Sequence, residues 1–178
     1  MADLRLLLVT GSTRPGSTNS AALRSARELV PDGVEGIVYE SLAELPHFDP
    51  DADQDPLPEP VVRLRAAIAA ADAVVFCTPE YAGTLPGTFK NLLDWTVGGA
   101  EMYGRRATWI NVAAPGRGDG ADATLRTVLG YVGAAVLESS GTRVPVARDA
   151  VGGSGVIEDD DTRRRLGEAL RTIVAELS

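Results

Sequence analysis

The sequence is poor in the residues that build disulfide frameworks and zinc centres. Its 178 residues include one cysteine, Cys77, and one histidine, His47. A single cysteine excludes an intrachain disulfide, and one residue of each kind excludes a zinc site assembled from several Cys or His ligands. We therefore expect no bound metal. Cys77 lies inside an apolar run and is expected to be an inert core thiol, and His47 is expected at the surface.

Positive charge is also scarce. Asp and Glu together number 25 against 17 for Lys and Arg, which gives a formal net charge of -8. A protein that binds DNA or RNA needs a cationic surface to displace counterions from the phosphates. This charge balance therefore argues against a nucleic-acid partner.

Long hydrophobic runs are absent from the sequence. The first apolar run, residues 4–9, is shorter than the hydrophobic part of a signal peptide and has no small-residue cleavage site after it. No later run has the length of about 20 residues that a membrane helix needs. With no capacity for disulfides, these absences favour a cytoplasmic protein without membrane association.

What remains has the composition of a globular domain. Hydrophobic residues make up 44% of the chain and charged residues 24%, which is the usual range for a folded protein. A chain of this length can bury one full core, and we see no linker or internal repeat. We therefore expect a single domain over residues 1–178.

Short apolar runs alternate with stretches of helical periodicity along the chain. The pattern predicts strands at 4–10, 34–39, 73–77 and 108–113, a broken fifth strand at 134–137 with 144–147, and helices at 19–30, 61–71, 86–96, 122–131 and 160–177. The Pro- and Asp-rich segment 46–60 is expected to be a surface loop without regular structure. Continuously apolar strands that alternate with helices are typical of a doubly wound parallel sheet.

Ligands of such sheets bind at the carboxyl ends of the strands, so the loops 11–20, 78–87 and 114–120 are the candidate site. The first of these loops combines glycines, hydroxyls, an amide and Arg14, which is the chemistry of an anion site. Ser17 stands where a Walker A loop has its lysine, which argues against a nucleoside triphosphate and leaves a monophosphate. The alternative is a solvated turn with a helix cap at Ser17, Thr18 or Asn19.

The loop after the third strand, Pro79–Gly87, is stiffened by proline and glycine and is long for a simple connection. Its restrained backbone could present N–H and C=O groups to a flat heterocycle, with Tyr81 as an aromatic neighbour. The alternative is a rigid turn whose tyrosine covers the core.

Together these residues resemble the NADPH-dependent FMN reductases, a flavodoxin-like family that includes chromate and quinone reductases. The resemblance rests on Gly11-Ser12 with Arg14, Ser17 and Asn19, on Pro79-Glu80-Tyr81, and on Pro86-Gly87, Lys90-Asn91 and Asp94-Trp95. It implies an α/β fold, a flavodoxin-like three-layer sandwich with a five-stranded parallel sheet.

The resemblance also implies the cofactor and its contacts. Ser12, Arg14, Ser17 and Asn19 would hold the FMN phosphate, and Pro79, Glu80 and Tyr81 would line the isoalloxazine. Gly11, Thr18, Ala82 and Gly83 would be further cofactor-binding residues. Gly116 and Arg117 would lie near the pyrimidine end of the flavin. Arg117 could instead meet the 2'-phosphate of NADPH or be solvated. Ala82 departs from the family, which often has Asn at this position.

The function implied by the resemblance is an NAD(P)H-dependent FMN reductase. Hydride would pass from NADPH or NADH to FMN, and the electrons would then pass to free flavin, a quinone or a similar small acceptor. No side chain is expected to be catalytic. The resemblance further implies a homodimer through the helix that begins at Pro86, with Trp95 near the partner, and leaves a tetramer open. The alternatives are a flavodoxin-type electron carrier and a non-catalytic FMN-binding domain.

Overall fold

Strands and helices alternate along the chain in a computed structural model that describes residues 4–177. The strands are β1 (Leu4–Thr10), β2 (Val34–Tyr39), β3 (Ala73–Cys77), β4 (Arg106–Asn111), β5 (Ala135–Val136) and β6 (Thr142–Arg143). The helices are α1 (Thr18–Leu29), α2 (Glu59–Ala69), α3 (Gly87–Asp94), α4 (Asp119–Tyr131) and α5 (Asp160–Ala175). The first three strands have the predicted bounds, while β4 begins and ends two residues earlier than predicted.

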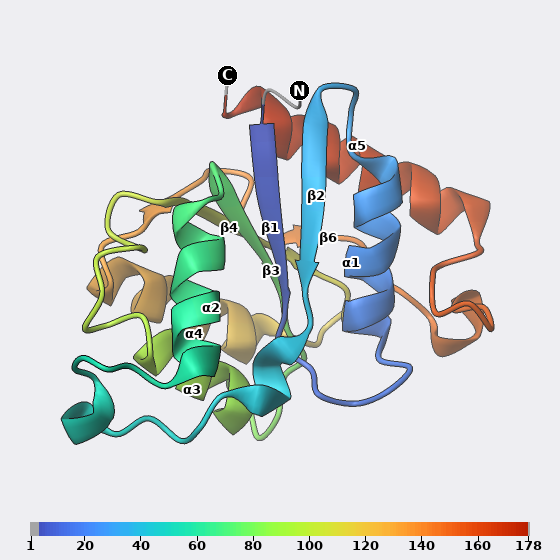
Figure 1. The fold of residues 1–178 in the computed structure, drawn as a ribbon. Coiled ribbons are helices and arrows are strands. Elements are labelled where there is room, and N and C mark those ends of the chain that lie inside the picture. The colour runs from blue at the N-terminus through green and yellow to red at the C-terminus, as the bar shows by residue number, and fades with distance from the viewer. Residues whose placement is uncertain (1–3, 178) are drawn as a thin grey trace.

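All strand pairs are parallel, and the sheet order is β2-β1-β3-β4-β5 (Figure 1). The fifth position is shared, because β5 pairs with the start of β4 and β6 pairs with its end. The predicted break in the fifth strand is thus confirmed. Its second half begins at Thr142, two residues earlier than predicted, and backbone bonds carry the pairing on through Val144 and Val146.

Helices cover both faces of the sheet, which confirms the three-layer sandwich. Alternate residues of β1 point to opposite faces. Leu7 belongs to a core cluster with α2, α3 and α4, and Leu8 belongs to a second cluster with α1 and α5. Figure 1 shows α1 and α5 on one side of the sheet and α2, α3 and α4 on the other. All five residues of β3 are buried, as expected of a central strand covered on both faces.

The segment 46–60 is more ordered than predicted. It contains a short 3-10 helix, Pro50–Ala52, so the prediction of a loop without regular structure is wrong there. The stretch before this turn folds over α3. The Phe48 amide donates to Asn91 Oδ1 at 2.7 Å, and the Asn91 and Trp95 side chains both donate to the Pro46 carbonyl, at 2.9 and 2.8 Å.

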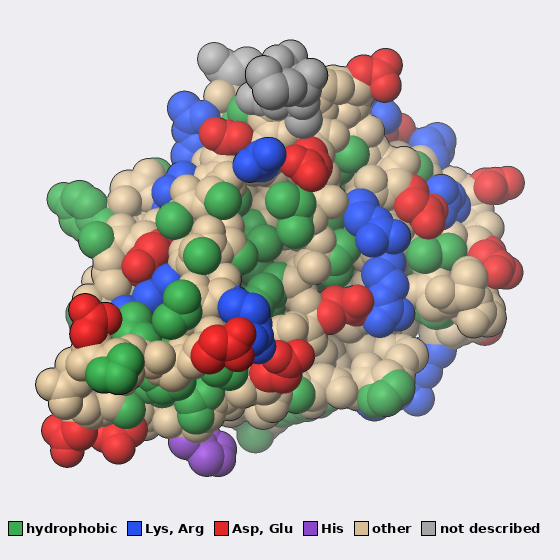
Figure 2. Space-filling model, viewed as in Figure 1, with side chains coloured by type: hydrophobic (Ala, Val, Ile, Leu, Met, Phe, Trp, Pro, Cys, Tyr) green, Lys and Arg blue, Asp and Glu red, His purple; other side chains and the backbone are tan. Residues whose placement is uncertain are grey.

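Trp95 therefore belongs to the core of its own chain. Its side chain is 0% exposed, and the ring of Phe48 packs edge-on against it with centroids 5.1 Å apart. The folded 46–48 segment covers its ring, and the expectation that Trp95 lies near a partner stays a prediction. On the face of the molecule that Figure 2 shows, acidic and basic side chains are interspersed. Within residues 4–177, no helix combines the length and apolar character needed to span a bilayer.

Candidate functional site

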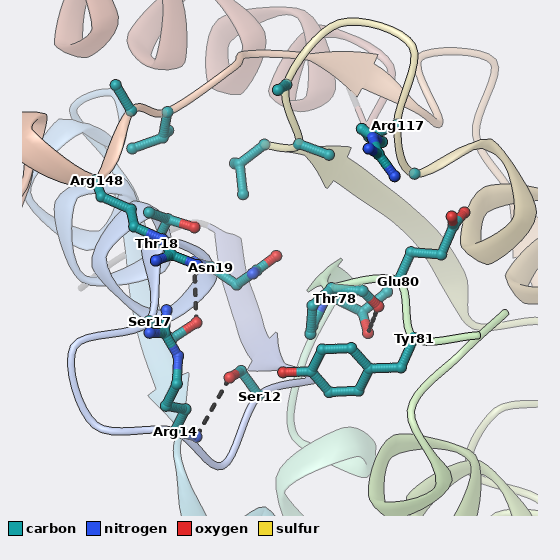
Figure 3. Close-up of a pocket in the computed structure, with 17 residues that line it drawn as sticks. Ser12, Arg14, Ser17, Thr18, Asn19, Thr78, Glu80, Tyr81, Arg117 and Arg148 are labelled. Carbon is teal, nitrogen blue, oxygen red and sulfur yellow. Dashed lines mark hydrogen bonds between the residues drawn. The ribbon is translucent and has the colours of Figure 1, made fainter. Parts of the chain in front are cut away.

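A cleft of about 620 Å³ opens at the carboxyl ends of the parallel strands (Figure 3). The loops after β1, β3 and β4 border it, as the topology predicted, and a fourth border is the segment after β6. The lining residues are Ser12, Arg14, Ser17, Thr18, Asn19, Thr78, Pro79, Glu80, Tyr81, Val112, Ala113, Ala114, Arg117, Gly118, Val146, Ala147 and Arg148. The volume is in the range of small-molecule and cofactor pockets, about 300–1,000 Å³.

The loop after β1 is held by its own hydroxyl groups. Ser17 caps α1, and its Oγ accepts the Asn19 amide at 3.2 Å. Ser12 Oγ accepts the Arg14 amide at 3.3 Å. In each case the hydroxyl oxygen acts as an acceptor, so the hydroxyl proton stays available for a ligand.

This end of the cleft keeps further donors free. Among residues 4–177, the Thr18 and Ser20 amides at the start of α1 have no hydrogen-bond acceptor. The first amides of a helix lack partners inside the helix, and they carry the positive end of its dipole. Asn19 Oδ1 accepts the Cys77 thiol at 3.3 Å, which leaves its Nδ2 group as a donor. The loop therefore offers free hydroxyls, free amides and a helix start, the groups from which anion sites are built.

Three arginines, Arg14, Arg117 and Arg148, add positive charge to the same cleft. Within the described part of the chain none of their guanidinium groups meets a carboxylate or another acceptor. Most of the other arginines of this acidic protein are paired, for example Arg24 with Glu40 at 2.5 Å. A group of unpaired guanidiniums at a concave surface attracts and binds anions.

Glu80 is the one carboxylate among the described residues of the lining, and it forms hydrogen bonds within the protein. Its Oε2 accepts the amides of Gly120 at 2.7 Å and Ala121 at 3.1 Å, in the first turn of α4. The cap position of α4 is Gly118, which has no side chain to do this. Glu80 therefore caps α4 from a distance and joins the loop after β3 to the loop after β4.

The turn that follows Glu80 presents Tyr81 at the mouth of the cleft. Tyr81 and Thr84 exchange backbone hydrogen bonds of 3.0 and 3.1 Å around a tight turn. The two central residues, Ala82 and Gly83, have φ values of 51° and 75°. Asn and Gly tolerate this left-handed conformation, whereas alanine adopts it at a cost. Tyr81 is 54% exposed, so its ring is free to cover a ligand.

The loop after β4 is held in place by hydrogen bonds and an ion pair. Arg143 donates to the Arg117 carbonyl at 2.8 Å and forms an ion pair with Asp119. Asn111 donates to Asp122 Oδ2 at 2.8 Å and accepts the Ala113 amide at 3.0 Å. Burial raises the pKa of the Asp122 carboxyl, and the Asn111 hydrogen bond and the Arg143 charge oppose that rise. These contacts hold the backbone of the loop and leave the Arg117 side chain free.

Nine of the thirteen predicted site residues line the cleft, and four do not. The four are Gly11, Ala82, Gly83 and Gly116. A Cβ on Gly11 would lie 2.2 Å from Thr78 Oγ1, so this glycine allows two loops to approach each other. Ala82, Gly83 and Gly116 shape turns through their positive φ angles.

The sequence reasoning overlooked the segment after β6. Val146, Ala147 and Arg148 border the cleft, although only the loops after the first, third and fourth strands were considered. The signal was available, because the broken fifth strand also ends at the carboxyl edge of the sheet. Val112 and Ala113 lie just before the predicted loop 114–120 and were overlooked as well, since small apolar residues carry no chemical signature.

Cys77 and His47 lie where the sequence suggested. Cys77 is buried in β3, and burial raises the pKa of its thiol far above the usual range, so it stays protonated and inert. His47 is exposed and is not part of the cleft lining. In the described range, no three His, Cys, Asp or Glu side chains are grouped so that they could hold a metal ion.

The chain is similar in sequence and in structure to known oxidoreductases. Residues 4–147 match the sequence model of a family described as NADPH-dependent FMN reductase. The chain is similar to the NAD(P)H-dependent FMN reductase of Pseudomonas aeruginosa, with 33% identity over 96% of this chain and 94% of the relative. It is also similar to the NAD(P)H:quinone oxidoreductase of Solanum tuberosum, with 29% identity over 93% of this chain and 88% of the relative. Among solved structures, the flavoenzyme NAD(P)H:(acceptor) oxidoreductase FerB from Paracoccus denitrificans superposes with a TM-score of 0.82 at 27% identity, covering 98% of this chain and 97% of FerB.

Proposed function

The chain belongs to the NADPH-dependent FMN reductase family, and from that membership we propose that it is an FMN-dependent NAD(P)H oxidoreductase that passes electrons to free flavin, a quinone or a similar small acceptor. The observation that carries the proposal is the polarity of the cleft. One end is an anion site with unpaired arginines, and the rest is an open slot between Tyr81 and small apolar residues.

FMN fits this polarity. Its phosphate would lie at the start of α1 against Ser12, Arg14, Ser17, Thr18 and Asn19, where hydroxyl and amide donors are free. Its isoalloxazine would lie along the backbone of the Pro79–Tyr81 stretch, with Val112, Ala113 and Ala114 opposite. The amides of the loop that contains Gly116 and Arg117 could stabilise negative charge at the pyrimidine end. Ala82 and Gly83 would contribute through the shape of the turn.

Bound FMN would supply the two-electron chemistry, and the protein would bind and orient it. Among residues 4–177, the cleft lining contains no histidine, lysine or cysteine, and its one carboxylate, Glu80, accepts two amides of α4. We therefore propose that no side chain acts as an essential acid or base. Because Tyr81 lies exposed at the mouth of the cleft, we propose that NADPH or NADH and the acceptor approach in turn from that side.

We propose that residues 1–178 act as one domain, in the cytoplasm, as a homodimer that could pair into a tetramer. The composition supports the cytoplasmic location. A chain with one buried cysteine forms no intrachain disulfide, and disulfides are typical of proteins in oxidising compartments. Val97, which follows α3 and is 63% exposed, offers apolar surface at the proposed interface. Light scattering of the purified protein would measure the assembly.

The experiment that tests the function combines flavin retention with reduction. The protein is incubated with FMN, desalted, and titrated anaerobically with NADPH or NADH while the flavin absorbance is recorded. Bleaching of retained flavin by either nucleotide supports the reductase. Retained flavin that neither nucleotide bleaches would indicate an electron carrier instead, and absence of both retention and FMN-dependent NAD(P)H oxidation would refute the proposal.

Arg14→Ala tests the placement of the phosphate. We expect it to weaken FMN binding by about tenfold, the worth of one hydrogen bond to a charged group at a partly exposed site, and to leave riboflavin binding nearly unchanged. Arg171→Ala is the matched control, because Arg171 is exposed on α5 and outside the cleft. Equal loss of both flavins in Arg14→Ala would place the phosphate elsewhere.

A further inference from the structure

Arg148 is the cleft residue that neither the family match nor the motifs account for. It follows the last matched residue, Ala147, and begins a short 3-10 helix, Arg148–Ala150, after β6. Figure 3 shows its side chain extending from that segment toward Thr18 at the start of α1, while Arg14 extends toward Ser17 from the loop after β1. Both side chains line the same cleft.

The segment that carries Arg148 is fixed to the site on two sides. Before Arg148, the Val146 amide donates to the Val112 carbonyl at 3.0 Å, which continues the sheet. After it, the Ile157 amide donates to Ser25 Oγ at 2.8 Å, and Ser25 is a buried residue of α1. These bonds connect the backbone on either side of Arg148 to the sheet and to α1, while the Arg148 side chain itself is exposed.

Acidic side chains lie close to Arg148, yet it does not pair with them. Asp149, Glu158 and Asp159 line a separate hollow of about 390 Å³, and Arg148 is not part of that lining. Within residues 4–177 its guanidinium meets no carboxylate, and it lines the FMN-sized cleft instead. Its guanidinium is therefore available to a ligand in that cleft.

Two arginines at this end of the cleft would match the charge of a phosphate group. A phosphate monoester carries a charge of about −1.5 to −2 at neutral pH, which one guanidinium only partly balances. Arg14 and Arg148 together supply two positive charges on two sides of the hydroxyls and amides at Ser17 and Thr18. Planar guanidinium groups are well suited to phosphate because each offers paired N–H donors.

We propose that Arg148 is a second phosphate-binding arginine for FMN, supplied by the segment after β6. This inference rests on the proposed function, because it assigns a contact to the cofactor of that function. It predicts that affinity for FMN over riboflavin depends on a residue beyond the part of the chain that matches the family.

The test is a fluorescence titration that measures the dissociation constants of FMN and riboflavin for the wild type, Arg148→Ala, Arg148→Lys and the control Arg171→Ala. We expect Arg148→Ala to weaken FMN binding about tenfold and riboflavin binding less than about twofold. Arg148→Lys should recover part of the lost FMN affinity, since lysine keeps the positive charge but lacks the paired N–H donors of the guanidinium. The salt dependence of FMN binding should be smaller in Arg148→Ala than in the wild type.

Several outcomes would overturn the assignment. Unchanged FMN affinity in a folded Arg148→Ala variant would do so, as would equal loss of FMN and riboflavin, which would indicate a disturbed segment. A selective loss of NADPH over NADH use with normal FMN binding would assign Arg148 to the dinucleotide instead. If the wild type binds neither flavin, the proposed function fails as well, whereas normal wild-type binding with an unaffected variant removes only the role of Arg148.

Discussion

Replacing Glu80 tests whether this residue acts through the protein scaffold. Its carboxylate accepts two amides in the first turn of α4, and the cap residue Gly118 cannot replace it. A helix cap contributes about 1 kcal/mol, and a carboxylate at a helix N-terminus adds about 0.3–1 kcal/mol through the dipole. Glu80→Ala should therefore lower the free energy of unfolding by about 2 kcal/mol, or the melting temperature by about 4–8 °C.

The measurement is thermal unfolding followed by circular dichroism on the protein freed of flavin, because a scaffold role does not need the cofactor. Glu80→Gln should lose about half as much, since its carbonyl oxygen still accepts the amides but has no charge. Glu138→Ala is the control, because Glu138 is exposed and has no partner among the described residues. A flavin-free Glu80→Ala protein that melts within about 1 °C of the wild type would refute the capping role.

Two further predictions follow from the backbone and from a second helix cap. Ala82→Asn should raise the melting temperature by about 2–4 °C, because asparagine tolerates the φ of 51° that costs alanine about 1 kcal/mol. The control is Ala123→Asn in helix α4, which should not raise the melting temperature. Thr162 donates two hydrogen bonds to Asp159 and lowers the pKa of that carboxyl. The stabilisation from the charged Asp159 is present above the usual aspartate pKa and is lost as the pH falls. The difference in melting temperature between Asp159→Ala and the wild type should therefore narrow below about pH 4. A difference that stays constant with pH would contradict a role for the Asp159 charge.

Much of the fold could be read from local patterns. Strand β3 is a continuous apolar run bounded by polar residues, and both its limits and its burial were predictable from that run alone. The anion loop after β1 was equally visible, because hydroxyls, glycines and Arg14 fall between a buried strand and a helix start. Helix ends were predicted less accurately. Helix α4 begins at Asp119, three residues earlier than predicted, and its N-terminus is capped by Glu80 from a distant loop.

The sequence by itself determined the alternation of elements, and with it the edge of the sheet where a ligand binds, because these depend on hydrophobic periodicity between near neighbours. Only the tertiary structure decided what each side chain does at that edge. Glu80 contacts residues 40 positions away, and Trp95 is covered by a segment 49 positions before it. Arg148 lines the cleft from a segment that contacts α1 through the bond from Ile157 to Ser25, 132 positions apart. Contacts between such distant residues arise from the packing of the whole chain, which no local pattern encodes.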